Sequence, residues 1–235
     1  MGRAFEFRKA RKMKRWSAMA KTFTRIGKEI VMAVKAGGPD PDGNARLRAV
    51  MQNAKAANMP KDNVMRAIKN ASNKDTSDYK EIIYEGYGPH GIAVLVEAAT
   101  NNNTRTVANL RNDFKKCGGS LGVSGSVIFM FDHTCNFTIE KGEHDVEELE
   151  LELIDFGADE VFEEEDKIMI YSSFENFGSI QSALEEMSIE IISSGFERIP
   201  TTTKELTGEA EEDMNKLLER LEEDDDVQNV YHAMI

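Results

Sequence analysis

The chain has 235 residues, 40% of them hydrophobic and 30% charged, which is typical of a globular protein with more than one small domain. No apolar run approaches the roughly 18 residues that a membrane-spanning helix needs, so we do not expect a membrane protein. Residues 1–80 hold 19 Lys and Arg against 7 Asp and Glu, a net charge of +12. Residues 81–235 hold 10 against 35, a net charge of −25. This asymmetry suggests that the basic half meets a polyanion and excludes a uniformly acidic protein.

The N-terminal residues and the two cysteines indicate the compartment in which the protein works. The N-terminus is basic and has no apolar core, so it does not resemble a secretory signal. An Arg-rich start would also fit a transit peptide, but the basic character continues past residue 30 into patterned helix, so we expect a cytoplasmic protein. Cys117 and Cys135 are too few for a disulfide framework and wrongly spaced for zinc, which predicts two reduced thiols.

The basic segment begins with a dense cationic run that ends at Trp16 and is followed by an amphipathic helix over residues 21–35. The apolar face of this helix consists of Phe23, Ile26, Ile30, Val31 and Val34. A second stripe, at steps of four, three and seven, is cationic: Lys21, Arg25, Lys28 and Lys35. Gly37 and Gly38 end the helix, and residues 39–44 form a turn.

Two further helices follow, one over residues 44–57 and one that begins at Pro60. Asp62 and Arg66 are spaced for an ion pair in the last helix, and residues 70–78 read as a polar linker. The residues of the helix connections either contact the partner or merely shape turns, and both interpretations stay open for Gly43, Asn58, Met59, Pro60 and Lys61.

The cationic excess accumulates over several helices, and few carboxylates neutralise it. A charged stripe on one helix is usually a solvated face, but a net charge of +12 suits a surface that displaces counterions from phosphates. We therefore predict nucleic-acid binding through Arg8, Lys9, Arg11, Lys12, Lys14, Arg15, Lys21, Arg25, Lys28, Lys55 and Lys61. The sequence has no helix-turn-helix or zinc-finger pattern, so no base-reading element is expected.

The acidic half alternates strands and helices. The first part predicts strands at 81–85, 92–97 and 126–131 with a helix at 104–117, and the chain ends with a helix at 208–223 and a strand at 227–231. Between them lies a βαββαβ pattern, the ferredoxin-like order: 135–139, 146–156, 160–162, 168–171, 180–187 and 190–196. We therefore predict an α+β protein with a helical domain at 1–78, a discontinuous domain at 79–133 and 201–235, and an inserted ferredoxin-like domain at 134–200.

Motifs that suggest enzymes fail on their context. Residues 86–91 fit G-x-G-x-x-G, but a strand follows where a dinucleotide site needs a helix. Residues 155–157 spell Asp-Phe-Gly, but the other kinase motifs are missing from the sequence. The four histidines are scattered, and the acidic runs lack calcium-loop spacing. We expect no enzyme activity, no cofactor, no metal site and no small-molecule substrate.

Several stretches resemble the YebC/PmpR family closely and over nearly the whole chain. They are Ala36–Asp42, Asn44–Arg48, Ala54–Asn63, Tyr84–Pro89, Asn103–Ala108, Gly118–Gly122 and Gly125–Val127. One departure is visible, because the family usually opens with Gly-His-Ser-Lys-Trp where this chain has Arg3-Ala4-Phe5-Glu6-Phe7. The resemblance implies the same three-domain arrangement and a DNA-binding transcriptional regulator. Members of the family, mitochondrial relatives included, are also linked to translation on the ribosome.

Three hypotheses follow. The first is a non-enzymatic DNA-binding regulator, and the second is a translation factor that binds the ribosome or its RNA. Lysine and arginine serve both kinds of phosphate, and the lack of a base-reading helix favours the ribosome slightly. The third, an enzyme with a cleft between domains, lacks converging polar groups in the sequence. The acidic half could orient the protein on a phosphate surface or dock on its own basic helices. We expect a monomer, although the sequence does not determine the oligomeric state.

Overall fold

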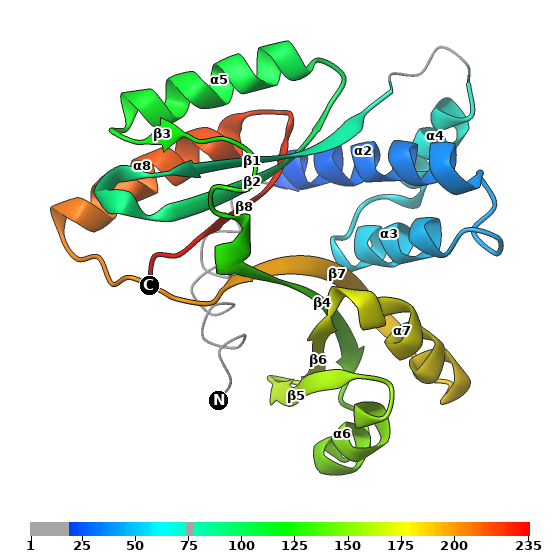
Figure 1. Ribbon diagram of the computed structural model, residues 1–235. Coiled ribbons are helices and arrows are strands. Elements are labelled where there is room, and N and C mark those ends of the chain that lie inside the picture. The colour runs from blue at the N-terminus through cyan, green and yellow to red at the C-terminus, as the bar shows by residue number, and fades with distance from the viewer. Residues whose placement is uncertain (1–18, 74–77) are drawn as a thin grey trace. The chain divides into compact units, whose positions relative to one another are not determined.

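The computed structural model describes residues 19–73 and 78–235 (Figure 1). The chain divides into two compact units. One unit takes the chain up to Asn73 and then residues His133–Ile199, and the other takes Lys74–Asp132 and Pro200–Ile235. Helices come first, and two four-stranded sheets with their own helices follow, which confirms the α+β fold class. The three predicted domain boundaries stay a prediction.

The helical region consists of α2 (Met19–Gly37), α3 (Ala45–Ala56) and α4 (Lys61–Ala71). Helix α2 packs against both α3 and α4. The apolar residues spaced three and four apart form the shared core, in which Ile30 and Leu47 are fully buried and Val64 is nearly so. The predicted helices are thus present, with bounds that differ by a residue or two.

A single asparagine fixes the junction of α2 and α3. The Asn44 side chain caps α3 by accepting from the backbone N–H of Leu47 at 3.1 Å, and its amide donates to the carbonyls of Ala33 and Gly38 at 2.8 Å each. A Cβ on Gly37 would lie 2.8 Å from this side chain, so glycine is required there. Capping and close packing therefore explain why Gly37 and Asn44 occur in the stretches that resemble the family.

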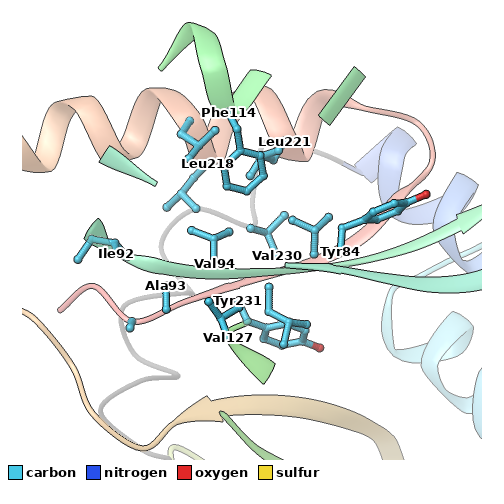
Figure 2. Close-up of a cluster of buried hydrophobic side chains, with 14 of the residues drawn as sticks. Tyr84, Ile92, Ala93, Val94, Phe114, Val127, Leu218, Leu221, Val230 and Tyr231 are labelled. Carbon is cyan, nitrogen blue, oxygen red and sulfur yellow. The ribbon is translucent and has the colours of Figure 1, made fainter. Parts of the chain in front are cut away.

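The second unit contains the first sheet, whose strands are β1 (Lys80–Tyr87), β2 (Ala93–Thr100), β3 (Ser120–Leu121) and β8 (Val227–His232). Their order is β3-β1-β2-β8, with antiparallel pairs throughout. Helices α5 (Asn103–Lys116) and α8 (Glu209–Glu223) supply the apolar side chains over one face. Figure 2 shows Val94 and Val230 pointing toward Phe114, Leu218 and Leu221.

The last strand of the chain therefore pairs with β2, although the whole second sheet lies between them in sequence. That sheet consists of β4 (Phe131–Glu140), β5 (Ala158–Glu164), β6 (Lys167–Ser173) and β7 (Ile191–Pro200) in the order β5-β6-β4-β7. Its helices are α6 (Val146–Ile154) and α7 (Phe177–Glu186), preceded by the short η4 (Phe174–Asn176). The ferredoxin-like plan and its insertion are both confirmed.

The strand predicted at residues 126–131 is wrong. The structure places a two-residue strand, β3, earlier in the chain, then a turn, the 3₁₀ helix η3 (Ile128–Met130) and the start of β4 at Phe131. The cause is the Glu85 carboxylate, which accepts from the backbone N–H groups of Gly125, Val127 and Ile128 at 2.6 to 2.8 Å. Because these donors are used by a side chain, they do not form a strand ladder.

The two enzyme-like motifs have the structural roles expected for them. Residues 86–91 connect β1 and β2 through the short 3₁₀ helix η2 (Pro89–Gly91), and the glycines are followed by a strand in place of the α-helix that a dinucleotide site needs. Gly157 follows the end of α6 with a φ of 94°, a conformation that glycine adopts without strain.

Candidate nucleic-acid interface

The predicted interface begins with the cationic run of residues 8–15. Arg8, Lys9, Arg11, Lys12, Lys14 and Arg15 lie outside the described residues. The described helical region, residues 19–73, still holds ten Lys and Arg against four Asp and Glu, a net charge of +6. The described helical region is therefore itself cationic enough to attract a polyanion.

The cationic stripe of α2 has mixed surroundings. Lys21 and Arg25 are partly exposed and Lys35 is exposed. Lys28 is buried, with 8% of its surface exposed. The helical periodicity is correct, but Lys28 faces solvent much less than the other members of the stripe.

The connection between α3 and α4 is a shaped turn. Asn58 has a φ of 57°, the left-handed region, and the N–H of Met59 donates to the carbonyl of Ala54 at 2.8 Å. Pro60 stands at the N-cap of α4. These contacts favour the architectural interpretation of the turn, and they leave Lys61, the first residue of α4, exposed.

Helix α4 presents a cationic face to solvent. Lys61, Met65 and Lys69 follow at steps of four, and Arg66 lies beside them. All four are exposed, Met65 with 51% of its surface. The ion pairs formed by the described residues do not include the predicted pair of Asp62 with Arg66. They also include no pair made by Lys61 or Lys69. Sequence reasoning missed Arg66 and Lys69 as contact candidates, although their spacing from Lys61 already indicated them.

Cations of the second unit have a different use. The Arg105 guanidinium donates to the carboxylate of Asp226 at 2.6 Å, and the hydroxyls of Thr106 and Thr100 donate to the same oxygen at 2.8 and 3.1 Å. Asp226 is 4% exposed, so this carboxylate is satisfied inside the fold. The Arg220 guanidinium donates twice to Asp113, at 3.0 and 2.8 Å. These two arginines connect the helices and loops of their own unit.

The ferredoxin-like region, residues 133–199, is strongly acidic. It holds 3 Lys and Arg against 19 Asp and Glu, a net charge of −16. It contacts the helical region of the same unit through Asn53, whose amide donates to the carbonyl of Ser194 at 2.6 Å and accepts from its N–H at 2.9 Å. Because β7 is an edge strand, this side chain satisfies backbone groups that a neighbouring strand would otherwise pair.

Two ion pairs accompany this contact. Lys55 lies 3.0 Å from Glu190, with both side chains about four-fifths exposed, and Arg48 lies 4.0 Å from Glu185. Arg48 also donates to the carbonyls of Pro41 and Asp42 at 2.9 and 3.0 Å. Exposed pairs of this kind are weak, so Lys55 keeps most of its ability to meet a phosphate.

Residues 19–73 and 78–235 contain no group of three or more His, Cys, Asp or Glu side chains arranged to hold a metal ion. Within these same ranges, no helix has both the length and the apolar character required to cross a bilayer.

Comparisons with known proteins decide the family. Residues 3–74 match the family model described as the TACO1/YebC protein N-terminal domain, and residues 79–234 match the model for the TACO1/YebC second and third domain. The chain belongs to the TACO1/YebC family. This finding confirms the resemblance that the sequence motifs indicated.

Relatives in the TACO1/YebC family are similar over the full length. A protein of Flavobacterium johnsoniae is 72% identical over 100% of this chain and 99% of its own, and one of Parabacteroides distasonis is 61% identical over 100% and 97%. Both are named probable transcriptional regulatory proteins. The crystal structure of a conserved hypothetical protein from Aquifex aeolicus is 36% identical, with a TM-score of 0.78 over 94% of this chain and 91% of that one. The names support a regulator at the level of the family.

Proposed function

We propose that this protein is a non-enzymatic, nucleic-acid-binding regulator of gene expression whose helical region contacts phosphates. The observation that carries the proposal is the exposed face of α4. Lys61, Arg66 and Lys69 point their charges to solvent, whereas Arg105 and Arg220 are held by carboxylates. Cations without a strong internal partner are the ones that can release counterions from a phosphate backbone.

Two targets fit this surface. The names of the relatives support a role in transcription, for which duplex DNA is the first target to test. A ribosome- or RNA-binding translation factor is the second candidate, because lysine and arginine contact DNA and RNA phosphates alike. It is favoured by the lack of a helix-turn-helix or zinc-finger pattern in the sequence, since these are the common base-reading elements.

The test is equilibrium binding of the full chain to labelled duplex DNA and to ribosomal RNA at several salt concentrations. A variant with Lys61, Arg66 and Lys69 changed to alanine should bind about tenfold more weakly or worse, and its salt slope should fall by about 2 to 3. The matched control changes Lys80 and Lys167, which are exposed cations outside the helical region. Equal losses in the variant and the control would refute an α4 interface.

A further inference from the structure

Helix α6 exposes two apolar side chains that the core of its own region does not use. Leu151 and Ile154 have 71% and 59% of their surfaces exposed. Among the exposed large hydrophobic residues described, they are the only two that lie on one helix. Leu149 and Leu153, 4% and 0% exposed, bury this helix against the core of the ferredoxin-like region. Single exposed apolar residues are ordinary, but neighbouring ones that the core does not need indicate a contact surface.

Helical geometry directs Leu151 away from the sheet. Helix α6 packs beside β5 (Figure 1). Each residue turns a helix by about 100°, so Leu151 lies about half a turn from both Leu149 and Leu153. The exposed pair is therefore on the outer side of α6, where a partner can reach it without disturbing the core.

Carboxylates surround this apolar pair. Residues three and four apart are neighbours on a helix surface, with Cβ atoms about 5 to 6 Å apart. The neighbours of Leu151 are therefore Glu147, Glu148, Ile154 and Asp155, and all of them are exposed. The ion pairs formed by the described residues include none of these three carboxylates. We call these five residues the α6 patch.

The charge around the α6 patch selects its partner. Residues 142–166 hold 13 Asp and Glu and no Lys or Arg. The first cations on either side are Lys141 and Lys167, and Lys141 is paired with Glu163. The wider region of residues 133–199 has the same sign, with 3 Lys and Arg against 19 Asp and Glu. Such a surface repels nucleic acid and anionic lipid headgroups and attracts a cationic partner.

We propose that the α6 patch binds a basic amphipathic segment of a partner protein. An apolar side chain of that segment packs on Leu151 and Ile154, and its lysines or arginines meet the three carboxylates. Long cationic side chains also cover apolar surface with their methylene groups, so they complement both parts of the patch. The inference goes beyond the proposed function, because no residue of the patch belongs to the helical region. With the phosphate contact proposed for α4, it gives the chain surfaces suited to an assembly of nucleic acid and basic protein.

The experiment measures fluorescence anisotropy of a labelled synthetic peptide with the full chain at about 0.15 M salt. The peptide is a helix of about 14 lysine and leucine residues, with the leucines three and four positions apart. A second peptide has alanine in place of each leucine. The leucine peptide should bind about tenfold more tightly or better, because it buries more apolar surface on the patch.

The apolar part of the patch is tested without a change of charge. Leu151→Ser together with Ile154→Ser should weaken binding of the leucine peptide about tenfold. The matched control is Val123→Ser, which changes a 77% exposed apolar residue in the second unit and should leave binding unchanged. Thermal melts confirm that each variant is folded.

The acidic part is tested by removing two charges. Glu147→Gln together with Glu148→Gln should weaken binding of the leucine peptide about three- to tenfold and make it less dependent on salt. The matched control is Glu211→Gln together with Glu212→Gln, which removes the same charge from exposed positions on α8. The control should change binding by less than about twofold.

Four results would overturn the inference. They are no binding of the leucine peptide, equal binding of the two peptides, equal losses in a patch variant and its control, and self-association that the Leu151 and Ile154 variant abolishes. Light scattering of the wild-type chain detects the last of these, which would assign the patch to a second copy. The proposed function fails separately, because the variant lacking Lys61, Arg66 and Lys69 should bind the peptide as the wild type does.

Discussion

The cations of α4 and two arginines of the second unit, Arg105 and Arg220, have opposite surroundings. Lys61, Arg66 and Lys69 face solvent, while Arg105 donates to a carboxylate that is 4% exposed. The first group adds nothing to the core, whereas Arg105 belongs to a network in which Asp226, the residue before β8, joins β2 to α5. A charge that the fold does not use is free for a partner, so formal charge predicts binding only after the internal pairs are removed.

The largest expected effect is the loss of stability when the carboxylate that holds Arg105 is removed. Asp226→Ala removes the acceptor of Arg105, Thr100 and Thr106 and leaves two buried hydroxyls without it. We expect the free energy of unfolding to fall by about 3 kcal/mol, measured by denaturant titration. The exposed neighbour Asp225→Ala should cost less than about 1 kcal/mol. A similar small cost for Asp226→Ala would show that the network is not needed for stability.

The second prediction concerns Glu85, whose charge is satisfied by backbone donors. Glu85→Gln should destabilise the protein by about 2 kcal/mol, because the amide group must face N–H donors. Since the pKa of Glu85 is lowered by folding, its contribution is present above the ordinary carboxyl pKa of 4.5 and is lost as the pH falls through the lower folded value. The wild-type protein should thus lose more stability on acidification than the variant. Parallel pH profiles would contradict this assignment.

A separate dependence of stability on pH is expected at His133, which stacks on Phe174 with ring centroids 4.0 Å apart. Burial and the nearby charge of Arg198 lower the pKa of His133 from 6.5 to about 4. The unfolded chain therefore binds a proton between these values and the folded chain does not, so stability falls as the pH drops from 6.5 to about 4. The slope is at most about 1.4 kcal/mol per pH unit. His133→Phe should flatten it, and an unchanged profile would show that other groups cause it.

The sequence predicted the elements well where periodicity decides. Steps of three and four on residues 21–35 identified α2, and the βαββαβ order identified the second sheet. The strand predicted at 126–131 was wrong because a carboxylate 40 residues away takes the backbone donors of this stretch, and nothing local distinguishes Glu85 from a solvated glutamate. For the same reason the sequence did not show that Lys28 is buried or that Arg105 is paired.

The candidate interface was predictable in part. The charge asymmetry selected the helical region, and within it Lys55 and Lys61 are exposed as a contact requires, so the interface stays a prediction. Arg66 and Lys69 were identified as contact candidates only from the structure, which shows that both face solvent on α4.

The most direct test of the central claim is co-sedimentation of the full chain with ribosomes at about 0.15 M salt, with and without excess random-sequence duplex DNA. The account predicts that the wild-type protein pellets with ribosomes or is removed from them by the DNA, and that the variant lacking Lys61, Arg66 and Lys69 stays in the supernatant. Retention against DNA supports the translation factor, and removal supports the DNA-binding regulator. Pelleting of the variant to the same extent as the wild type would contradict the claim that the exposed cations of α4 bind the polyanion.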